Sequence, residues 1–323
     1  MNGRMTSALA VTAGLALAGT AHAQEDFPQQ PVTIVVPFSP GGSNDIVARQ
    51  LGQQLQELWG EPVVIENRPG GGATIGSAYL AEQDPDGYTL MIASVTFTMN
   101  AAVQSELPYD SREDFTPIAL IGQVPLVIGA RPDIPAETPQ ELITYLQESD
   151  EPLSYGATGV GSIQHFAGEL FNQAAGTEVQ VIQYPGGAPA MTDVMGGHIE
   201  YSIGSMTQMK PQIDEGNIKG IAVTSLERSD AMPDLPTLAE SGLEDFEVIQ
   251  WWAILGPDGM DQALVDEINE DINQVLSSDA FTEFLAADGG TPRPMSAQET
   301  ADFMTRNFDR WAQVAEEAGI REE

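Results

Sequence analysis

Two glycine-rich stretches decide how this chain folds: Pro37-Phe38-Ser39-Pro40-Gly41-Gly42-Ser43-Asn44-Asp45 and Tyr184-Pro185-Gly186-Gly187-Ala188-Pro189. Each follows an apolar β-branched run and precedes a segment with the apolar spacing of a helix. A strand, a glycine turn and a helix start leave free backbone N–H groups at the positive end of the helix dipole, where anions bind. Two such loops in distant parts of the chain predict two halves that close on one carboxylate.

Around the first stretch, short buried-type strands alternate with helical patterns, which is typical of a parallel, doubly wound α/β sheet. The expected strands cover residues 31–36, 63–66 and 88–93, and the expected helices cover residues 44–58 and 74–82.

A second unit of the same kind begins near Thr138. Its expected helices are 139–148, 163–174 and 191–195, its strands are 153–155, 178–183, 198–203 and 218–223, and helices 261–276 and 297–317 follow. Strands at 115–121 and 124–130, with a crossing near 220–230, predict two lobes. We expect lobe 1 to contain residues 24–122 and 226–323 and lobe 2 residues 123–225. Ligands of such folds bind at the carboxyl ends of the strands, in the cleft.

The first 23 residues have the features of a secretory signal peptide. Arg4 supplies a positive charge, residues 7–20 are a short apolar run, and Ala21-His22-Ala23 is a small-x-small cleavage site. The run is short for a membrane span, so we prefer cleavage before Gln24 to the alternative of an uncleaved anchor. No cysteine adjoins the cleavage site, which excludes a lipoprotein anchor.

Charge restricts the classes of partner. Forty-eight acidic residues face twelve basic ones, too few basic groups to neutralise the phosphates of a nucleic acid. The acidic residues are scattered, and we interpret them as a solvated surface suited to high external salt. The alternative, an acidic site for cations, predicts carboxylates in the binding loops, where only Asp45 and Asp193 occur.

Several kinds of catalytic or cofactor site are excluded by missing residues. The chain has no cysteine, so it has no disulfide, thiol nucleophile or thiolate metal site, and His165 and His198 alone do not favour a zinc site. No lysine follows Gly161 as a P-loop requires, and Gln164 replaces the third glycine of a dinucleotide fingerprint. Because Gly-x-Ser-x-Gly is also missing, we expect no catalytic residues, metal or cofactor.

The loops themselves offer candidate ligand contacts. The first loop contributes Phe38, Ser39, Gly41, Gly42, Ser43 and Asp45. Asp45 lies in the first helical turn, where a carboxylate suits the dipole whether or not it contacts a ligand. The turn 156–162 is a further anion-binding candidate through Thr158 and Ser162. His165 either is a capped or buried side chain or points an N–H group at the ligand, and Trp251 and Trp252 are interpreted as packing or hinge residues.

A set of short motifs runs in order through nearly the whole mature chain: 35–42 (VVPFSPGG), 66–70 (ENRPG), 85–90 (PDGYTL), 107–110 (LPYD), 114–118 (DFTPI), 155–162 (YGATGVGS) with His165, 184–190 (YPGGAPA) and 222–225 (AVTS) with Arg228. With these motifs the chain resembles the periplasmic solute-binding proteins of tripartite tricarboxylate transporters, the Bug-type receptors. The resemblance implies a periplasmic, two-lobed Venus-flytrap protein in which each lobe is a mostly parallel sheet flanked by helices.

The resemblance also implies a distribution of roles within the site. The proximal carboxylate is held by the first loop (Phe38, Ser39, Gly42, Ser43, Asp45) and the second (Gly186, Gly187, Ala188). Ser94, Thr96, Thr158, Ser162 and His165 line the remainder and select the distal group, and we assign Gly41, Gly159, Tyr184 and Ser205 to the same site. Many relatives carry an aromatic-Asp pair where this chain has Ile203-Gly204-Ser205, a departure that opens the site to a more apolar or aromatic distal end.

We therefore expect a monomeric receptor that captures a small carboxylate, either a di- or tricarboxylate or an aromatic acid, and delivers it to a membrane permease. Two alternatives stay open at this point. One is a carboxylate sensor with a signalling partner, and the other is a secreted enzyme of similar fold.

Overall fold

The computed structural model describes residues 27–184 and 186–321, so the expected signal peptide lies outside it. The strands are β1 (Val32–Val36), β2 (Val63–Asn67), β3 (Thr89–Ser94), β4 (Phe115–Ala130), β5 (Ser154–Ala157), β6 (Gln180–Gln183), β7 (Tyr201–Ser205), β8 (Lys219–Val223), β9 (Ile249–Pro257) and β10 (Thr291–Pro292). The α-helices are α1 (Ser43–Trp59), α2 (Thr74–Ala81), α3 (Val95–Val103), α4 (Pro139–Glu148), α5 (Ile163–Ala175), α6 (Gly187–Met195), α7 (Met206–Asp214), α8 (Gln262–Leu276), α9 (Asp279–Ala286) and α10 (Ala297–Ala318). Short 3₁₀ turns cover Gly71–Ala73 and Ala239–Ser241.

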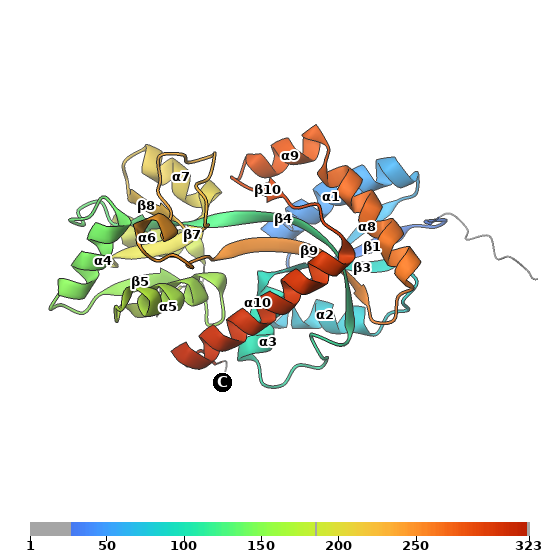
Figure 1. The fold of residues 1–323 in the computed structure, drawn as a ribbon, viewed down its shortest axis with the longest axis horizontal. Coiled ribbons are helices and arrows are strands. Elements are labelled where there is room, and N and C mark those ends of the chain that lie inside the picture. Colours follow the sequence, from blue (N-terminus) through green and yellow to red (C-terminus); the bar gives the residue numbers. More distant parts are fainter. Residues whose placement is uncertain (1–26, 185, 322–323) are drawn as a thin grey trace, which may run out of the picture.

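The strands form two groups that share β4, and each group with its helices is a lobe (Figure 1). In the first lobe, β1 pairs in parallel with β2 and β3, while β9 pairs antiparallel with β3 and β4. In the second lobe, β5 pairs in parallel with β6 and β7, while β7 and β8 pair antiparallel with β4. The prediction of an α/β protein with two lobes is confirmed.

One continuous strand, β4, replaces the two strands expected at 115–121 and 124–130. Its first part pairs with β9 from Phe115 to Pro125, and its last part pairs with β7 from Leu126 to Ala130. Gly122, which lies between the two expected strands, is closely packed within β4. A Cβ there would lie 2.6 Å from Leu285 Cδ1 and 2.9 Å from the Thr291 carbonyl oxygen.

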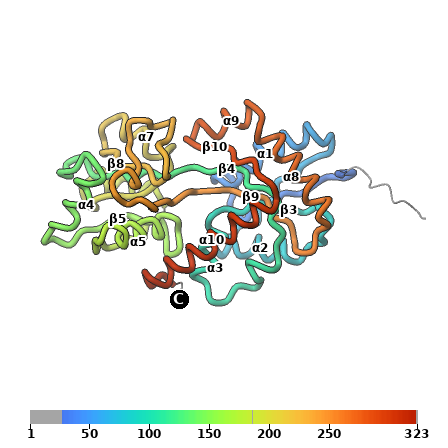
Figure 2. Tube along the Cα trace, viewed as in Figure 1, coloured from blue at the N-terminus to red at the C-terminus, as the bar shows by residue number. Residues whose placement is uncertain are grey.

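The second long strand between the lobes is β9, whereas a crossing was expected near 220–230. In the structure, β8 ends at Val223 and irregular chain follows before β9 begins at Ile249. The helix α10 also reaches both lobes (Figure 2). It packs on β4 and α3 and ends beside α5, where the rings of Trp311 and Phe166 lie 5.4 Å apart. The lobe boundaries given above stay a prediction.

Helices cover both faces of the first sheet, so its strands are buried on both sides. Ile34 and Val36 of β1 pack in a cluster with residues of α1 and α8, while Val35 between them faces a cluster with residues of α3 and α10. This alternation follows from the two-residue period of a strand.

Candidate ligand-binding site

The carboxyl ends of the parallel strands of both lobes point toward the other lobe. β9 runs opposite to β3 and β4, so β1 and β3 share the direction of β4, toward the second lobe. β7 runs opposite to β4, so β5, β6 and β7 end toward the first lobe. The two lobes touch there, since Thr207 N–H donates to Asp288 Oδ1 at 2.9 Å. Both glycine loops therefore belong to the region where the lobes meet.

In the described part of the chain, most helices that start in this region lack a side-chain cap, with α5 and its Ser162 cap as the exception. At the starts of α1, α3, α6 and α7, no described side chain caps the helix, and the N-cap residues are Gly42, Ser94, Gly186 and Ser205. By contrast, α4, α8, α9 and α10 each start at a side-chain cap: Thr138, Asp261, Ser278 and Ser296. α4 and α8 follow the outer ends of β4 and β9. The uncapped helix starts leave N–H groups available to an anion.

In the first loop, Asp45 is bound from several sides. Its carboxylate accepts hydrogen bonds from Gly41 N–H at 2.9 Å, Asn67 Nδ2 at 2.9 Å and Arg49 at 2.8 and 3.0 Å. The Arg49 guanidinium, with the N–H groups of Gly41 and Asn67, lowers the pKa of Asp45 to about 2. Asn67 also donates to the Phe38 carbonyl. Asp45 thus fixes the shape of the loop.

The other predicted members of this loop are more accessible. Ser39, Gly41, Gly42 and Ser43 are exposed, and Phe38 is half-buried. Gly41 has φ +85°, a left-handed backbone that favours glycine.

The second loop is tied down on one side and open on the other. Tyr184 donates its hydroxyl to Asp193 of α6 at 2.7 Å, and burial together with this carboxylate raises the pKa of Tyr184 to about 12. A Cβ on Gly187 would lie 2.6 Å from Gln208 Oε1, whereas a Cβ on Gly186 would meet no atom within 4 Å. Ala188 is exposed.

Most polar groups of the turn 156–162 are hydrogen-bonded to other residues of the protein. Thr158 donates to Gln164 at 2.8 Å, Gly159 N–H donates to Gln183 at 2.9 Å, and Ser162 caps α5 by accepting from His165 N–H at 3.2 Å. His165 is buried, and its Nδ1 accepts from Gly161 N–H at 3.3 Å. Burial lowers the pKa of His165, which disfavours the charged imidazolium.

Around the starts of α3 and α7, the structure adds Asn44 and Thr207 to the predicted residues Ser94, Thr96 and Ser205. Ser94 is buried and lies 3.5 Å from Asn44 Nδ2, while Thr96 is half-buried. Ser205 Oγ lies 3.1 Å from Thr207 Oγ1. Asn44 and Thr207 are polar residues in the first turns of helices after strand ends, and that position is the signal that could have identified them.

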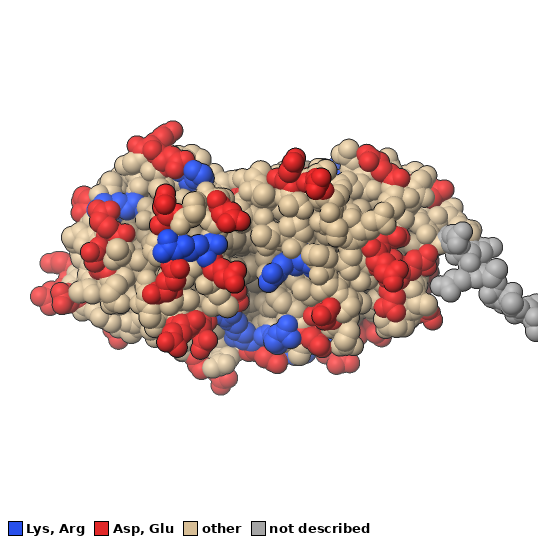
Figure 3. All heavy atoms as spheres, turned by 45° about the horizontal axis from the view of Figure 1, so that its top comes forward, with Lys and Arg blue, Asp and Glu red and all other residues tan. Residues whose placement is uncertain are grey.

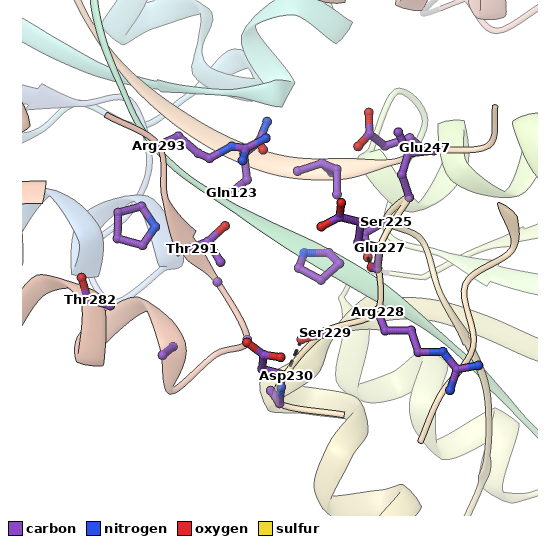
Figure 4. Close-up of a pocket in the computed structure, with 18 residues that line it drawn as sticks. Gln123, Ser225, Glu227, Arg228, Ser229, Asp230, Glu247, Thr282, Thr291 and Arg293 are labelled. Carbon is purple, nitrogen blue, oxygen red and sulfur yellow. Dashed lines mark hydrogen bonds between the residues drawn. The ribbon is translucent and has the colours of Figure 1, made fainter. Parts of the chain in front are cut away.

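A separate groove of about 550 Å³ lies on the strands between the lobes, and it contains none of the predicted ligand contacts (Figure 4). Gln123, Thr291 and Arg293 line one side, and Ser225, Arg228 and Glu247 line the other. Arg228 is engaged elsewhere, because its guanidinium bonds both Glu240 oxygens and the Pro233 carbonyl. The groove is thus distinct from the helix starts described above.

Acidic side chains are spread over both lobes on the face shown in Figure 3. Basic side chains mostly pair with them, as Arg112 does with Asp309 and Lys210 with Asp214. Within the described part of the chain, no group of three or more acidic, histidine or cysteine side chains could hold a metal ion. In residues 27–184 and 186–321, no helix has the length and apolar character that crossing a membrane requires.

Comparison with known proteins gives consistent matches over most of the chain. The family model described as "Tripartite tricarboxylate transporter family receptor" matches residues 47–320. Protein BugT of Bordetella pertussis is 34% identical over 325 residues, 98% of this chain and 99% of that protein. The structure of periplasmic binding protein BugD is 33% identical, with a TM-score of 0.75 over 92% of this chain and 100% of that one. A protein of R. palustris, solved with adipate, is 33% identical, with a TM-score of 0.79 over 92% of this chain and 99% of that one.

Proposed function

Because this chain belongs to the tripartite tricarboxylate transporter receptor family, we propose that it binds a small carboxylate between its lobes and delivers it to a membrane permease. The observation that carries the proposal is the set of uncapped helix starts at the facing strand ends of both lobes. The adipate in the similar R. palustris structure supports the same class of ligand.

Backbone N–H groups and hydroxyls perform the binding in this proposal. Arg49 of α1 is already bonded to Asp45 and Asn67. Uncharged donors suffice because the helix dipoles add positive potential, and donors held in place by the fold need little reordering when the ligand arrives. Ordered water completes such a site where a donor does not reach the ligand.

We assign the direct contacts to the accessible members of the two loops. Ser39, Gly42 and Ser43 act from the first lobe, and Gly186, Gly187 and Ala188 act from the second. Asp45 and Tyr184 hold the loops in shape, as their hydrogen bonds indicate. Ser94, Thr96 and Ser205 line the rest of the site, while the turn with Thr158, Gly159, Ser162 and His165 forms its wall.

The place of action follows from the same proposal. We infer that residues 1–23 export the chain to the periplasm and are then removed, and that the loaded protein docks on the permease there. Capture is a rotation of the lobes about β4 and β9, in which the ligand stabilises the closed arrangement by its contacts to both lobes.

A thermal-shift screen of purified mature protein against a panel of carboxylates tests the function. A ligand that binds only the native state stabilises it by about 2.7 kcal/mol at a hundredfold excess over Kd. We expect one class of acid to raise the melting temperature, while the primary amides of the same acids do not. The shift should persist at high salt, because contacts in a closed site are screened less than surface charges. If no acid in the panel raised the melting temperature at either salt concentration, the proposal would be contradicted.

A further inference from the structure

Two buried polar atoms beside Ser94 lack a hydrogen-bond partner among the described residues: Asn44 Oδ1 and Trp252 Nε1. Asn44 is 6% exposed and Trp252 is 2% exposed. Buried polar groups in native proteins are nearly always paired, so an unpaired donor and an unpaired acceptor in one place require an explanation.

Both residues are neighbours of Ser94. Asn44 Nδ2 lies 3.5 Å from Ser94 Oγ. Trp252 of β9 is the register partner of Ser94 of β3, and directly opposed residues of an antiparallel pair point to the same face of the sheet. Asn44, Ser94 and Trp252 thus form one cluster contributed by α1, β3 and β9.

The fold satisfies comparable groups elsewhere. Trp251, the adjacent residue on β9, donates its Nε1–H to Asn307 Oδ1 at 3.1 Å. The buried Asn269 donates to the Ile118 and Met295 carbonyls and accepts from Asn273. Seven other buried side-chain atoms of the described residues are also unpaired, Trp311 Nε1 among them. What distinguishes Asn44 and Trp252 is that an unpaired acceptor and an unpaired donor both lie beside Ser94.

The cluster lies at two uncapped helix starts. Asn44 is in the first turn of α1, whose N-cap is Gly42, and Ser94 is itself the N-cap of α3. A carboxylate bound to the N–H groups of α1 would bring the substituent on its adjacent carbon to the Asn44 side chain. The unpaired atoms are thus placed to contact the ligand and not only the protein.

We propose that Asn44 and Trp252 form a subsite that recognises a hydroxyl group next to the bound carboxylate, an inference that rests on the proposed function. A hydroxyl group both donates and accepts, so it can accept from Trp252 Nε1–H and donate to Asn44 Oδ1. A keto group only accepts, and a methylene group does neither. The ligand class is therefore the 2-hydroxy carboxylates.

Matched acids measure this preference directly. The probes are sets that differ only at the 2-position: glutarate, 2-oxoglutarate and 2-hydroxyglutarate; succinate and malate; propionate and lactate; phenylacetate and mandelate. Calorimetric titration of the mature protein gives the Kd of each acid. In the set that fits the site, we expect the hydroxy acid to bind roughly tenfold to a hundredfold more tightly than its parent, with the keto acid between them.

Substitutions separate recognition from a structural role. Trp252→Phe removes an unpaired donor and breaks no hydrogen bond to a described residue, so it should lower the hydroxyl preference toward one while unfolding free energy is retained. Asn44→Leu should lower the preference in the same way, but it also removes the contact of Nδ2 with Ser94 Oγ and should cost some stability. Trp251→Phe is the control, because it loses the bond to Asn307 and should cost stability but keep the preference.

The outcomes distinguish a failure of the subsite from a failure of the proposed function. Binding of acids with equal affinity for hydroxylated and parent forms would overturn the subsite and leave the proposed function intact. Retention of the wild-type preference in both Trp252→Phe and Asn44→Leu would also overturn it. Failure of every acid to bind would refute the proposed function, and this inference with it.

Discussion

The substitution Asp45→Asn tests how the first glycine loop is held in place. The pKa of Asp45 lies at about 2, compared with its ordinary value of 3.8. At 1.36 kcal/mol for each pKa unit, this difference corresponds to about 2 kcal/mol of stability near neutral pH. The Arg49 side chain is 52% exposed, and solvent weakens such a pair, so we expect a loss of about 1 to 2 kcal/mol.

The pH dependence gives the prediction a second signature. The folded-state pKa is depressed, so the contribution is complete above the unfolded pKa and is lost as the pH falls toward 2. Urea unfolding of both proteins should therefore show a constant difference near neutral pH that shrinks in acid. Asp261→Asn is the matched control, because Asp261 caps α8 through Ala263 N–H and asparagine caps equally well.

Two results would refute this reasoning. One is an Asp45→Asn protein that unfolds at the wild-type urea concentration near neutral pH. The other is a difference that stays the same in acid, which would mean that the carboxylate charge does not stabilise the loop. Ligand affinity should fall together with stability, since the substitution loosens the loop that carries Gly42 and Ser43.

Three further predictions concern single positions. Gly186→Val should leave the urea midpoint unchanged, because a Cβ there meets no atom within 4 Å. The same substitution should abolish the ligand-induced thermal shift, and an unaltered affinity in the folded variant would contradict the anion site. Gly122→Ala should destabilise the protein by about 1 to 3 kcal/mol in urea unfolding, because the new methyl group would crowd Leu285 and Thr291, and a stability equal to wild type would show that this packing is not tight. Wild-type stability should decrease as the pH falls below about 6.5, because the histidine of the unfolded state binds a proton more readily than the buried His165 of the folded state. In a plot of unfolding free energy against pH, His165→Gln should remove this part of the slope. An unchanged slope would assign the pH dependence to other groups.

Local signals in the sequence predicted the elements that they control. The helix 139–148 is predicted to the residue, because Thr138 and Glu141 form a capping box and Pro139 opens the first turn. The second glycine loop is less well marked. α6 begins at Gly187 and not at Met191, because Pro189 lies within its first turn, where proline is tolerated.

Long-range features could not be inferred in this way. The strand β9 contains Trp251 and Trp252, which were interpreted as packing or hinge residues, and its role depends on pairing with β3 and β4 far away in the sequence. Asp45 was expected either to contact a ligand or to suit the dipole. Its structural role became visible only when Asn67 of β2 was brought to it.

The path of α10 restricts how the lobes can move. This 22-residue helix starts at its Ser296 cap. In the first lobe, Thr300 Oγ1 of the helix accepts a hydrogen bond from Leu120 N–H. Further along, Trp311 packs against Phe166 of the second lobe. Two strands alone would allow a simple hinge, but a stiff rod fastened at one end and resting on α5 at the other does not bend with them. Any rotation of one lobe against the other must slide α5 along α10, which adds a shear component to the hinge and limits the directions in which the cleft can close.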